Sequence, residues 1–396
     1  MRTVVMLAML GWFARSASGQ ATMVTYPLSA KAPRIWTVGP RPLLEVGGAN
    51  GKGPSEFSDI HGVGRMPDGG VIIADANSAE IRQFDAAGRF VRNLTRKGKG
   101  PNEFISVNVM YMAGPLVVVH DPMLTTSIAS SAGASFVNHG RLAVERHFAN
   151  ATHVLDDSTV ILRLLKGDLR EAESHGDSLA VVRYDLRDSS VHFIGTQTRG
   201  RLYATPGNAP QYAFGFSGIP QIAVGAQQYC LGDGEQYIVS CYDRDGRERF
   251  TLRREVPRTR VTAAARKAFR DTAMGILPNG RSRFAGGLAA HRRQQVAAVQ
   301  FSEQYPAFSR LMIARNGELW VKSYEPENGI LTYLYAAPTG RPVRWSIYGR
   351  DGKWSADCIL PARFVPYDIG ADYVLGVSWD DDDVQRATLF PLRRGS

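Results

Sequence analysis

His61 is the residue of this sequence that is best suited to catalysis or metal binding, because an imidazole can bind a metal or transfer a proton near neutral pH. It lies four residues after Phe57, just before a strand-length apolar run. A catalytic zinc ion needs about three protein ligands, but the matching positions of later repeat units hold Asn150 and Ser309. We therefore favour a histidine that forms a hydrogen bond in the lining of a channel, with a metal ligand as the alternative.

Three aspartates form a second candidate site, because each follows the second apolar run of a unit: Asp75, Asp121 and Asp233. Carboxylates at repeated positions could bind Ca²⁺, which takes about six to eight oxygen ligands, with Asn77 as a further donor. They could equally cap turns by accepting hydrogen bonds from backbone N–H groups two residues on. Turn capping is the favoured interpretation. We expect no cofactor, and calcium or zinc remains the alternative.

Four side chains of one repeat unit are predicted to bind a ligand at the mouth of a channel: His61, Asp75, Asn77 and Arg82. The sequence contains no nucleophile elbow, no His-Glu-x-x-His and no phosphate-binding loop. We therefore assign no catalytic residue.

A basic segment offers a separate anion site. Residues 253–293 contain eleven Lys and Arg residues against two acidic ones, in a chain whose net charge is +10. Such a segment attracts anionic glycans, lipid head groups or acidic partners, and the candidate residues are Arg266, Lys267, Arg270, Arg292 and Arg293. A solvated helical face is the simpler interpretation. No RNA- or DNA-binding pattern is present, so nucleic acid is not an expected partner.

An internal repeat indicates the fold that must position these residues. Residues 51–57 (Gly-Lys-Gly-Pro-Ser-Glu-Phe) recur as residues 98–104 with one change, at an offset of 47. This offset is close to the length of a four-stranded propeller blade. Between the copies, short apolar runs alternate with Pro-Asp-Gly and Asp-x-x-Gly turns, which indicates successive antiparallel strands.

The same alternation returns along the chain and makes six units. An early strand, at residues 35–38 or 43–46, is then left over. In a closed propeller such a strand pairs with the final blade and covers its exposed edge. The prediction is an all-β, six-bladed β-propeller over residues 34–396, closed by an N-terminal strand.

The segment from Phe57 to Phe90, with its Pro-Asp-Gly turn and its Ile81-Arg82-Gln83-Phe84-Asp85 run, resembles the NHL repeat. The whole mature chain resembles the bacterial exported six-bladed β-propeller family, which is largely uncharacterised. In peptidyl-hydroxyglycine lyases and streptogramin lyases, which share this architecture, a histidine in a context like that of His61 serves as a metal ligand or catalytic residue. The resemblance implies a fold but little about activity.

One segment departs from the strand pattern. Residues 262–274 and 292–304 are rich in helix-forming residues and lack turn residues. They predict a helical insertion at about residues 259–305, between the fourth and fifth blades. Such an insertion can pack over one face of the disc and cap the central channel.

Three cysteines, Cys230, Cys241 and Cys358, are few for an exported protein. A turn at residues 232–235 would place Cys230 opposite Tyr237 and would prevent a bond to Cys241. Three small buried thiols are therefore expected.

The N-terminus has the three parts of an export signal: Arg2, an apolar run at residues 4–14 and small residues at 16–19. We expect residues 1–20 to be a signal peptide. No cysteine follows it, so no lipid anchor is expected, and no later run is long enough to span a membrane. The mature protein should be secreted or periplasmic, and monomeric.

The favoured function is therefore a non-enzymatic binding scaffold whose ligand, at the channel mouth, is a small molecule, peptide, glycan or envelope protein. One alternative is a metal-dependent lyase or lactone hydrolase on the same fold. The other is an anion-docking module that uses the basic insertion.

Overall fold

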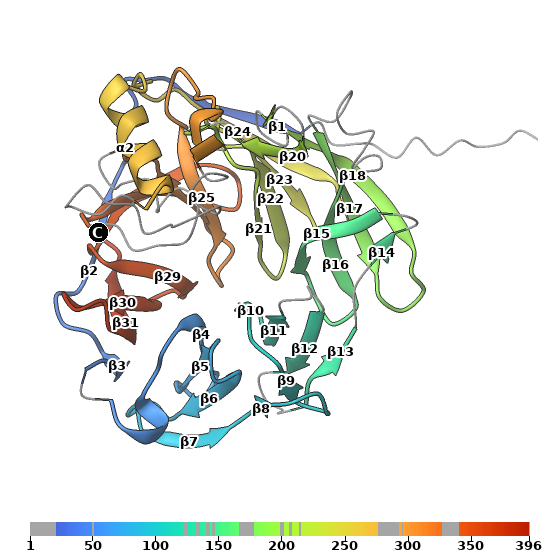
Figure 1. Cartoon of the computed structure of the whole chain (residues 1–396), viewed down its shortest axis with the longest axis vertical. Coiled ribbons are helices and arrows are strands. Elements are labelled where there is room, and N and C mark those ends of the chain that lie inside the picture. The colour runs from blue at the N-terminus through green and yellow to red at the C-terminus, as the bar shows by residue number, and fades with distance from the viewer. Residues whose placement is uncertain are drawn as a thin grey trace, which may run out of the picture.

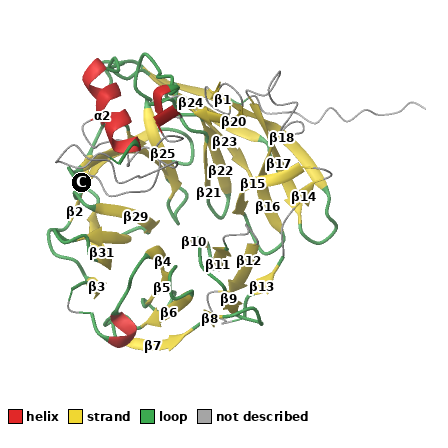
Figure 2. Ribbon diagram, in the orientation of Figure 1, coloured by secondary structure: helices red, strands yellow, loops and turns green. Residues whose placement is uncertain are grey.

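The computed structural model describes residues 21–49, 51–121, 126–130, 135–139, 143–144, 147–165, 178–198, 202–205, 208–213, 215–275, 293–294, 296–326 and 340–395. Strands predominate in these residues, as Figure 2 shows. The expected all-β character is therefore confirmed.

Most strands belong to small antiparallel sheets whose members follow one another along the chain (Figure 1). The first sheet contains β4 (Ile60–Arg65), β5 (Val71–Asp75), β6 (Glu80–Phe84) and β7 (Phe90–Asn93). The next contains β10 (Val109–Ala113), β11 (Leu116–His120), β12 (Thr126–Ser130) and β13 (Val137–Asn138). A third contains β14 (Ala143–Val144), β15 (His147–Val154), β16 (Thr159–Leu165), β17 (Ser178–Asp185) and β18 (Val191–Thr198).

The later sheets include strands from the start of the chain. One contains β21 (Gln221–Val224), β22 (Gln228–Gly232), β23 (Ile238–Asp243), β24 (Glu248–Arg254) and, parallel to β24, β1 (Thr22–Tyr26). The last and largest contains β25 (Phe308–Ile313), β26 (Leu319–Ser323), β27 (Val343–Tyr348), β28 (Trp354–Leu360), β29 (Phe364–Ile369), β30 (Tyr373–Trp379), β31 (Gln385–Arg393), β2 (Ile35–Val38) and β3 (Leu44–Gly47). Short pieces complete the set: η1 (Gly53–Ser55), β8 (Arg96–Lys97), β9 (Glu103–Phe104), β19 (Leu202–Thr205) and β20 (Asn208–Ala213).

Local sequence explains the hairpins. In the β4–β5 turn, the Asp68 carboxylate accepts a hydrogen bond from the Gly70 N–H at 2.9 Å. Gly69 has a φ of +86°, a conformation that side chains with a Cβ atom rarely adopt. The Pro-Asp-Gly sequence therefore reverses the chain as predicted.

The sheets stand around a common centre, and β4, β10, β21, β25 and β29 are the labelled strands nearest to it (Figure 1). Buried apolar clusters join successive sheets. One cluster contains Val63 and Ile73 of the first sheet together with Leu375 and Val377 of β30, so the end of the ring packs against its beginning. Burial of apolar faces between neighbouring sheets stabilises this propeller-like arrangement.

Two glycines allow the inner strands to approach closely. A Cβ atom at Gly62 would lie 2.1 Å from the carbonyl oxygen of Met110, and one at Gly64 would lie 2.4 Å from the Met112 side chain. Any larger residue would push β4 away from β10.

The N-terminal strands close the ring, as predicted. β3 pairs antiparallel with β31. β2 pairs with β31 on one side and with β28 on the other, and thus links two groups of strands into a single sheet. The edge of β31 is therefore covered.

The repeated Gly-Lys-Gly-Pro segments form loops that anchor an aromatic residue between sheets. Phe57 packs beside Phe84, and Phe104 lies in the cluster between the first two sheets. In the second copy, Glu103 accepts hydrogen bonds from the Gly100 N–H and the Arg96 guanidinium. These contacts agree with the expected role of the segments in turns.

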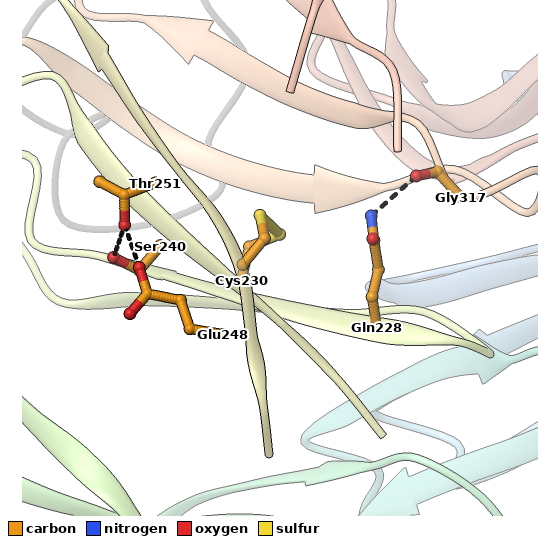
Figure 3. The surroundings of a disulfide bond; sticks show 7 residues. Gln228, Cys230, Ser240, Glu248, Thr251 and Gly317 are labelled. Atoms are coloured by element: carbon orange, nitrogen blue, oxygen red, sulfur yellow. Dashed lines mark hydrogen bonds between the residues drawn. A yellow bond between two sulfur atoms is a disulfide. The ribbon is translucent and has the colours of Figure 1, made fainter. Parts of the chain in front are cut away.

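Cys230 and Cys241 form a disulfide (Figure 3), so the prediction of three thiols was wrong. The two residues face each other directly across β22 and β23. The ladder between the two strands ends at Leu231 and Ser240, so the connecting loop is longer than expected. Tyr237 lies in this loop and is buried, and its hydroxyl accepts a hydrogen bond from Tyr348 at 3.0 Å. Cys358 is a buried thiol, and burial raises its pKa to about 12.

Helix α2 (Ala263–Ala273) follows β24 and begins at Thr262, whose hydroxyl caps the Ala265 N–H. Phe269 anchors it in a cluster with Phe216 and Tyr305. In Figure 1 the helix lies towards the rim of the ring rather than over its centre. The expected second helix is wrong in its C-terminal part, because Phe301 and Gln304 form β-bridges with Gly215 and Arg260.

Candidate functional site

A cavity of about 450 Å³ lies among the inner strands. Most of its walls come from β10, β21 and β25, and single residues come from neighbouring strands. Its apolar lining includes Met110, Met112, Ile222, Leu311 and Met312. Such a volume suits a small organic molecule.

Arg310 of β25 brings a cation into this cavity. Within the described residues its guanidinium has no hydrogen bond or ion pair, and its one ring contact is with Tyr367, 5.8 Å from the ring centre. Burial lowers the pKa of Arg310, and Tyr367 opposes this effect. A guanidinium in that position remains charged and lacks a counter-ion.

Arg163 of β16 contributes a second cation to the lining of the cavity. One of its terminal nitrogens donates to the Pro220 carbonyl at 2.9 Å, while its buried Nε has no partner among the described residues. Burial lowers the pKa of Arg163 to about 10. The side chain is thus charged at neutral pH, and its Nε–H is available to donate a further hydrogen bond.

His153 of β15 completes the polar part of the lining. Burial, followed by the charges of Arg163 and His120, lowers the pKa of His153 to about 3. Its Nδ1 is buried and has no hydrogen-bond partner in the part of the chain that the structure describes. His153 is therefore a neutral imidazole whose Nδ1 can donate or accept one hydrogen bond, according to the tautomer.

Two aromatic side chains and another imidazole are fixed around these groups. The Tyr111 hydroxyl accepts the Val154 N–H at 2.9 Å, and its ring lies 5.9 Å from that of His120. The Nδ1 of His120 lies 3.3 Å from the Thr126 hydroxyl. Burial raises the pKa of Tyr111 and of Tyr367, so both phenols stay neutral.

The charge of the lining is one-sided. The described residues of the lining include two arginines and two histidines and no aspartate or glutamate. Lys322, paired with Arg310 across β25 and β26, adds a further cation nearby. The described lining is therefore positively charged, although the charge of Asp59 also acts on Tyr367.

His61 lies next to this cavity but does not line it. On β4, its Nδ1 donates to the Asn108 carbonyl at 2.8 Å, and its Nε2 lies 3.1 Å from the Asp59 carboxylate. Asn108 is part of the lining. His61 thus forms hydrogen bonds beside the channel, whereas its role in ligand binding remains a prediction.

The other predicted ligand-binding residues hold the first sheet together. Asp75 is buried and accepts hydrogen bonds from the N–H groups of Ser58 and Asn77. Arg82 donates to the carbonyls of Pro54 and Glu56 and pairs with Glu80. None of Asp75, Asn77 and Arg82 lines the cavity, and their binding of a ligand stays a prediction.

The metal candidates do not come together. No group of three or more potential ligands that could hold a metal ion occurs among the described residues. Asp75 caps the turn at Asn77, and Asp233 accepts the Glu235 N–H at 3.0 Å, both two residues on as expected for turn capping. The side chain of Asn150 lies outside the described residues, and the Ser309 hydroxyl donates to the Ser323 carbonyl.

Some of the basic residues on and after α2 that could bind an anion already contact other side chains. Arg266 and Arg270 both lie over the ring of Phe301, and Lys267 pairs with Asp271 at 2.5 Å. Arg293 is exposed, and Arg292 lies outside the described residues. Anion binding by this segment remains a prediction.

The sequence-based search missed Arg163, His153 and Arg310. A signal was present, because Arg163 and Arg310 each interrupt an apolar strand. A charged residue inside an apolar strand needs a counter-charge, water or a ligand.

Comparisons with known proteins add context for the fold. No protein-family model and no curated protein sequence matches the chain. A protein of Bacteroides fragilis whose name describes it as exported is 12% identical, with a TM-score of 0.49, over 95% of this chain and 100% of that one. A member of the DUF4221 family from Bacteroides vulgatus is 11% identical, with a TM-score of 0.46, over 86% and 93% of the two chains. The calcium-binding protein regucalcin of Agrobacterium tumefaciens is 11% identical, with a TM-score of 0.39, over 91% and 97%.

Among the described residues, no helix combines the length and the apolar character that crossing a membrane requires.

Proposed function

We propose that the chain is an exported six-bladed β-propeller of NHL-like repeats that binds a small organic molecule in its central cavity. The strand groups β4–β7, β10–β13, β14–β18, β21–β24, β25–β28 and β29–β31 would be the blades, and α2 would belong to an insertion between the fourth and fifth. Residues 1–20 would be the export signal, and the mature protein would act as a monomer outside the cytoplasm.

One observation carries the binding proposal: a cavity of about 450 Å³ lies where the inner strands converge, with both apolar walls and unpaired polar groups. A stable protein rarely leaves buried polar atoms unpaired without a reason. A bound molecule supplies partners for those atoms and covers the apolar walls. His61, beside Asn108, is the residue that we place at the mouth.

A thermal-shift screen of small molecules, followed by a cavity-blocking variant, tests the proposal. Val109 lines the cavity and is 40% exposed, so Val109→Trp should obstruct it without disturbing the core. Val91 of β7 is 50% exposed and lies outside the cavity, so Val91→Trp is the matched control. Ligands of the wild type should lose their thermal shift with Val109→Trp and keep it with Val91→Trp. Shifts that survive Val109→Trp would place binding elsewhere.

The export proposal is tested separately. Expression of the full chain with cell fractionation should give a mature protein outside the cytoplasm that begins near residue 20. An intact N-terminus on a cytoplasmic product would contradict it.

A further inference from the structure

We propose that the ligand of the central cavity is an organic anion, with a carboxylate or phosphate head held by Arg163 and Arg310 and an apolar body against the methionine-rich wall. This inference rests on the proposed binding function and specifies its ligand class. It depends on the unpaired Arg163 Nε and His153 Nδ1 and on the absence of carboxylates from the described lining of the cavity.

The two arginines have no counter-charge among the residues that the structure describes. Arg310 has neither a hydrogen bond nor an ion pair among the described residues, and Arg163 meets only a carbonyl oxygen. Arg82, by contrast, is buried and pairs with the carboxylate of Glu80. A desolvated guanidinium without a carboxylate is costly unless an anion binds.

The uncharged side chain of His153 also supports an anionic head group on the ligand. The buried Nδ1 of His153 has no partner in the described structure, and a neutral imidazole can present its N–H to an oxygen there. No carboxylate among the described lining residues competes with the ligand for the guanidinium donors. A guanidinium binds the planar oxygens of a carboxylate or the oxygens of a phosphate through paired hydrogen bonds.

The apolar part of the lining indicates that the anion is not a bare inorganic ion. Met110, Met112 and Met312 line the same cavity as the cations. Methionine side chains adapt to irregular apolar shapes, and about 450 Å³ far exceeds the space of one carboxylate or phosphate. The body of the ligand should therefore be a hydrocarbon chain or ring.

Isothermal titration calorimetry of the mature protein with matched probes tests this inference. The probes are 4-phenylbutyrate, 3-phenylpropyl phosphate and the uncharged 4-phenylbutanamide. Each anion should bind about tenfold or more tightly than the amide, because hydrogen bonds to a charged group are the stronger ones. The two anions also show which head group the site prefers.

Two substitutions and a matched control locate the interaction. Arg310→Met and Arg163→Met should each weaken binding of the preferred anion about tenfold or more and leave binding of the amide unchanged. Arg249→Met, in an exposed strand position of β24, should change neither the binding of the anion nor the binding of the amide. Should either methionine variant fail to fold, Arg310→Gln and Arg163→Gln take its place with the same expectation.

The outcomes separate the two proposals. If the amide binds as tightly as the anions and Val109→Trp blocks both, the cavity binds small molecules but not by charge, and only this inference fails. Equal anion binding by wild type, Arg310→Met and Arg163→Met also overturns it. If neither anion binds the wild type at millimolar concentration, the anionic ligand class is rejected.

Discussion

Arg310, which lines the central cavity, and Lys322 occupy paired positions on β25 and β26, so two cationic side chains lie side by side. Like charges on directly opposed strand positions destabilise a sheet. Burial, followed by the charge of Arg310, lowers the pKa of Lys322 to about 8, and Glu325 opposes this shift only in part. The pair therefore lowers folding stability while both groups carry a charge.

This pair predicts an unusual pH dependence. The ordinary pKa of a lysine is 10.5, above the value of about 8 in the folded protein. The unfolded chain therefore binds more protons between pH 8 and pH 10, and the stability contributed by this group rises with pH across that window.

Substitution of Lys322 should remove this rise of folding stability between pH 8 and pH 10. We expect Lys322→Met to be more stable than wild type by about 1 to 3 kcal/mol at pH 7, with a difference that shrinks as the pH approaches 10. Urea unfolding at pH 7, 8, 9 and 10 measures it, with the exposed Lys31→Met as the control. A difference that is constant with pH would show that Lys322 titrates normally.

His153 should limit stability in acid. Its folded-state pKa of about 3 lies below its ordinary value of 6.5, so the unfolded chain takes up a proton first as the pH falls. Stability should decrease between pH 6.5 and pH 3 by up to about 1.4 kcal/mol per pH unit from this group. His153→Gln should flatten the profile measured by denaturant unfolding, whereas His192→Gln, at an exposed position, should leave it steep.

The disulfide can be counted and tested. Unfolded, unreduced protein should react with one maleimide per chain, at Cys358, because Cys230 and Cys241 are bonded to each other. Three labels per chain would contradict the structure.

Loss of the disulfide should lower stability. The Cys230→Ala/Cys241→Ala variant should lose about 2 to 3 kcal/mol of unfolding free energy, because the bond restricts the unfolded chain. Differential scanning calorimetry measures this against Cys358→Ala, which removes the remaining thiol.

Asp368 joins the end of the ring to its beginning. Its carboxylate accepts two hydrogen bonds from Arg315 and one from the backbone N–H of Arg65, at 2.7, 2.5 and 2.8 Å. Asp368→Ala leaves these donors unpaired and should cost about 2 to 3 kcal/mol. Chemical unfolding measures the loss, and Asp372→Ala, whose side chain is 82% exposed, should change stability by less than about 0.5 kcal/mol. Equal effects of the two substitutions would contradict the role of Asp368.

The local part of the structure followed from the sequence. The Pro67-Asp68-Gly69 turn and the flanking apolar runs produced the β4–β5 hairpin, because turn geometry and side-chain alternation depend on neighbouring residues alone. The capping roles of Asp75 and Asp233 were predicted for the same reason. Strand pairing at the N-terminus was also predicted, since a leftover strand must cover an edge.

The disulfide and the cavity were decided by the tertiary structure. The loop between Cys230 and Cys241 contains Tyr237, whose hydroxyl accepts a hydrogen bond from Tyr348, and no local pattern shows a partner 111 residues away. In the same way, Arg163 and Arg310 lie on strands far apart in the sequence and line one cavity because the sheets turn about a common centre. The sequence by itself determined which segments become strands, through interactions among near neighbours. Which charges meet, and which are left without a partner, was set by the packing of those strands around the centre.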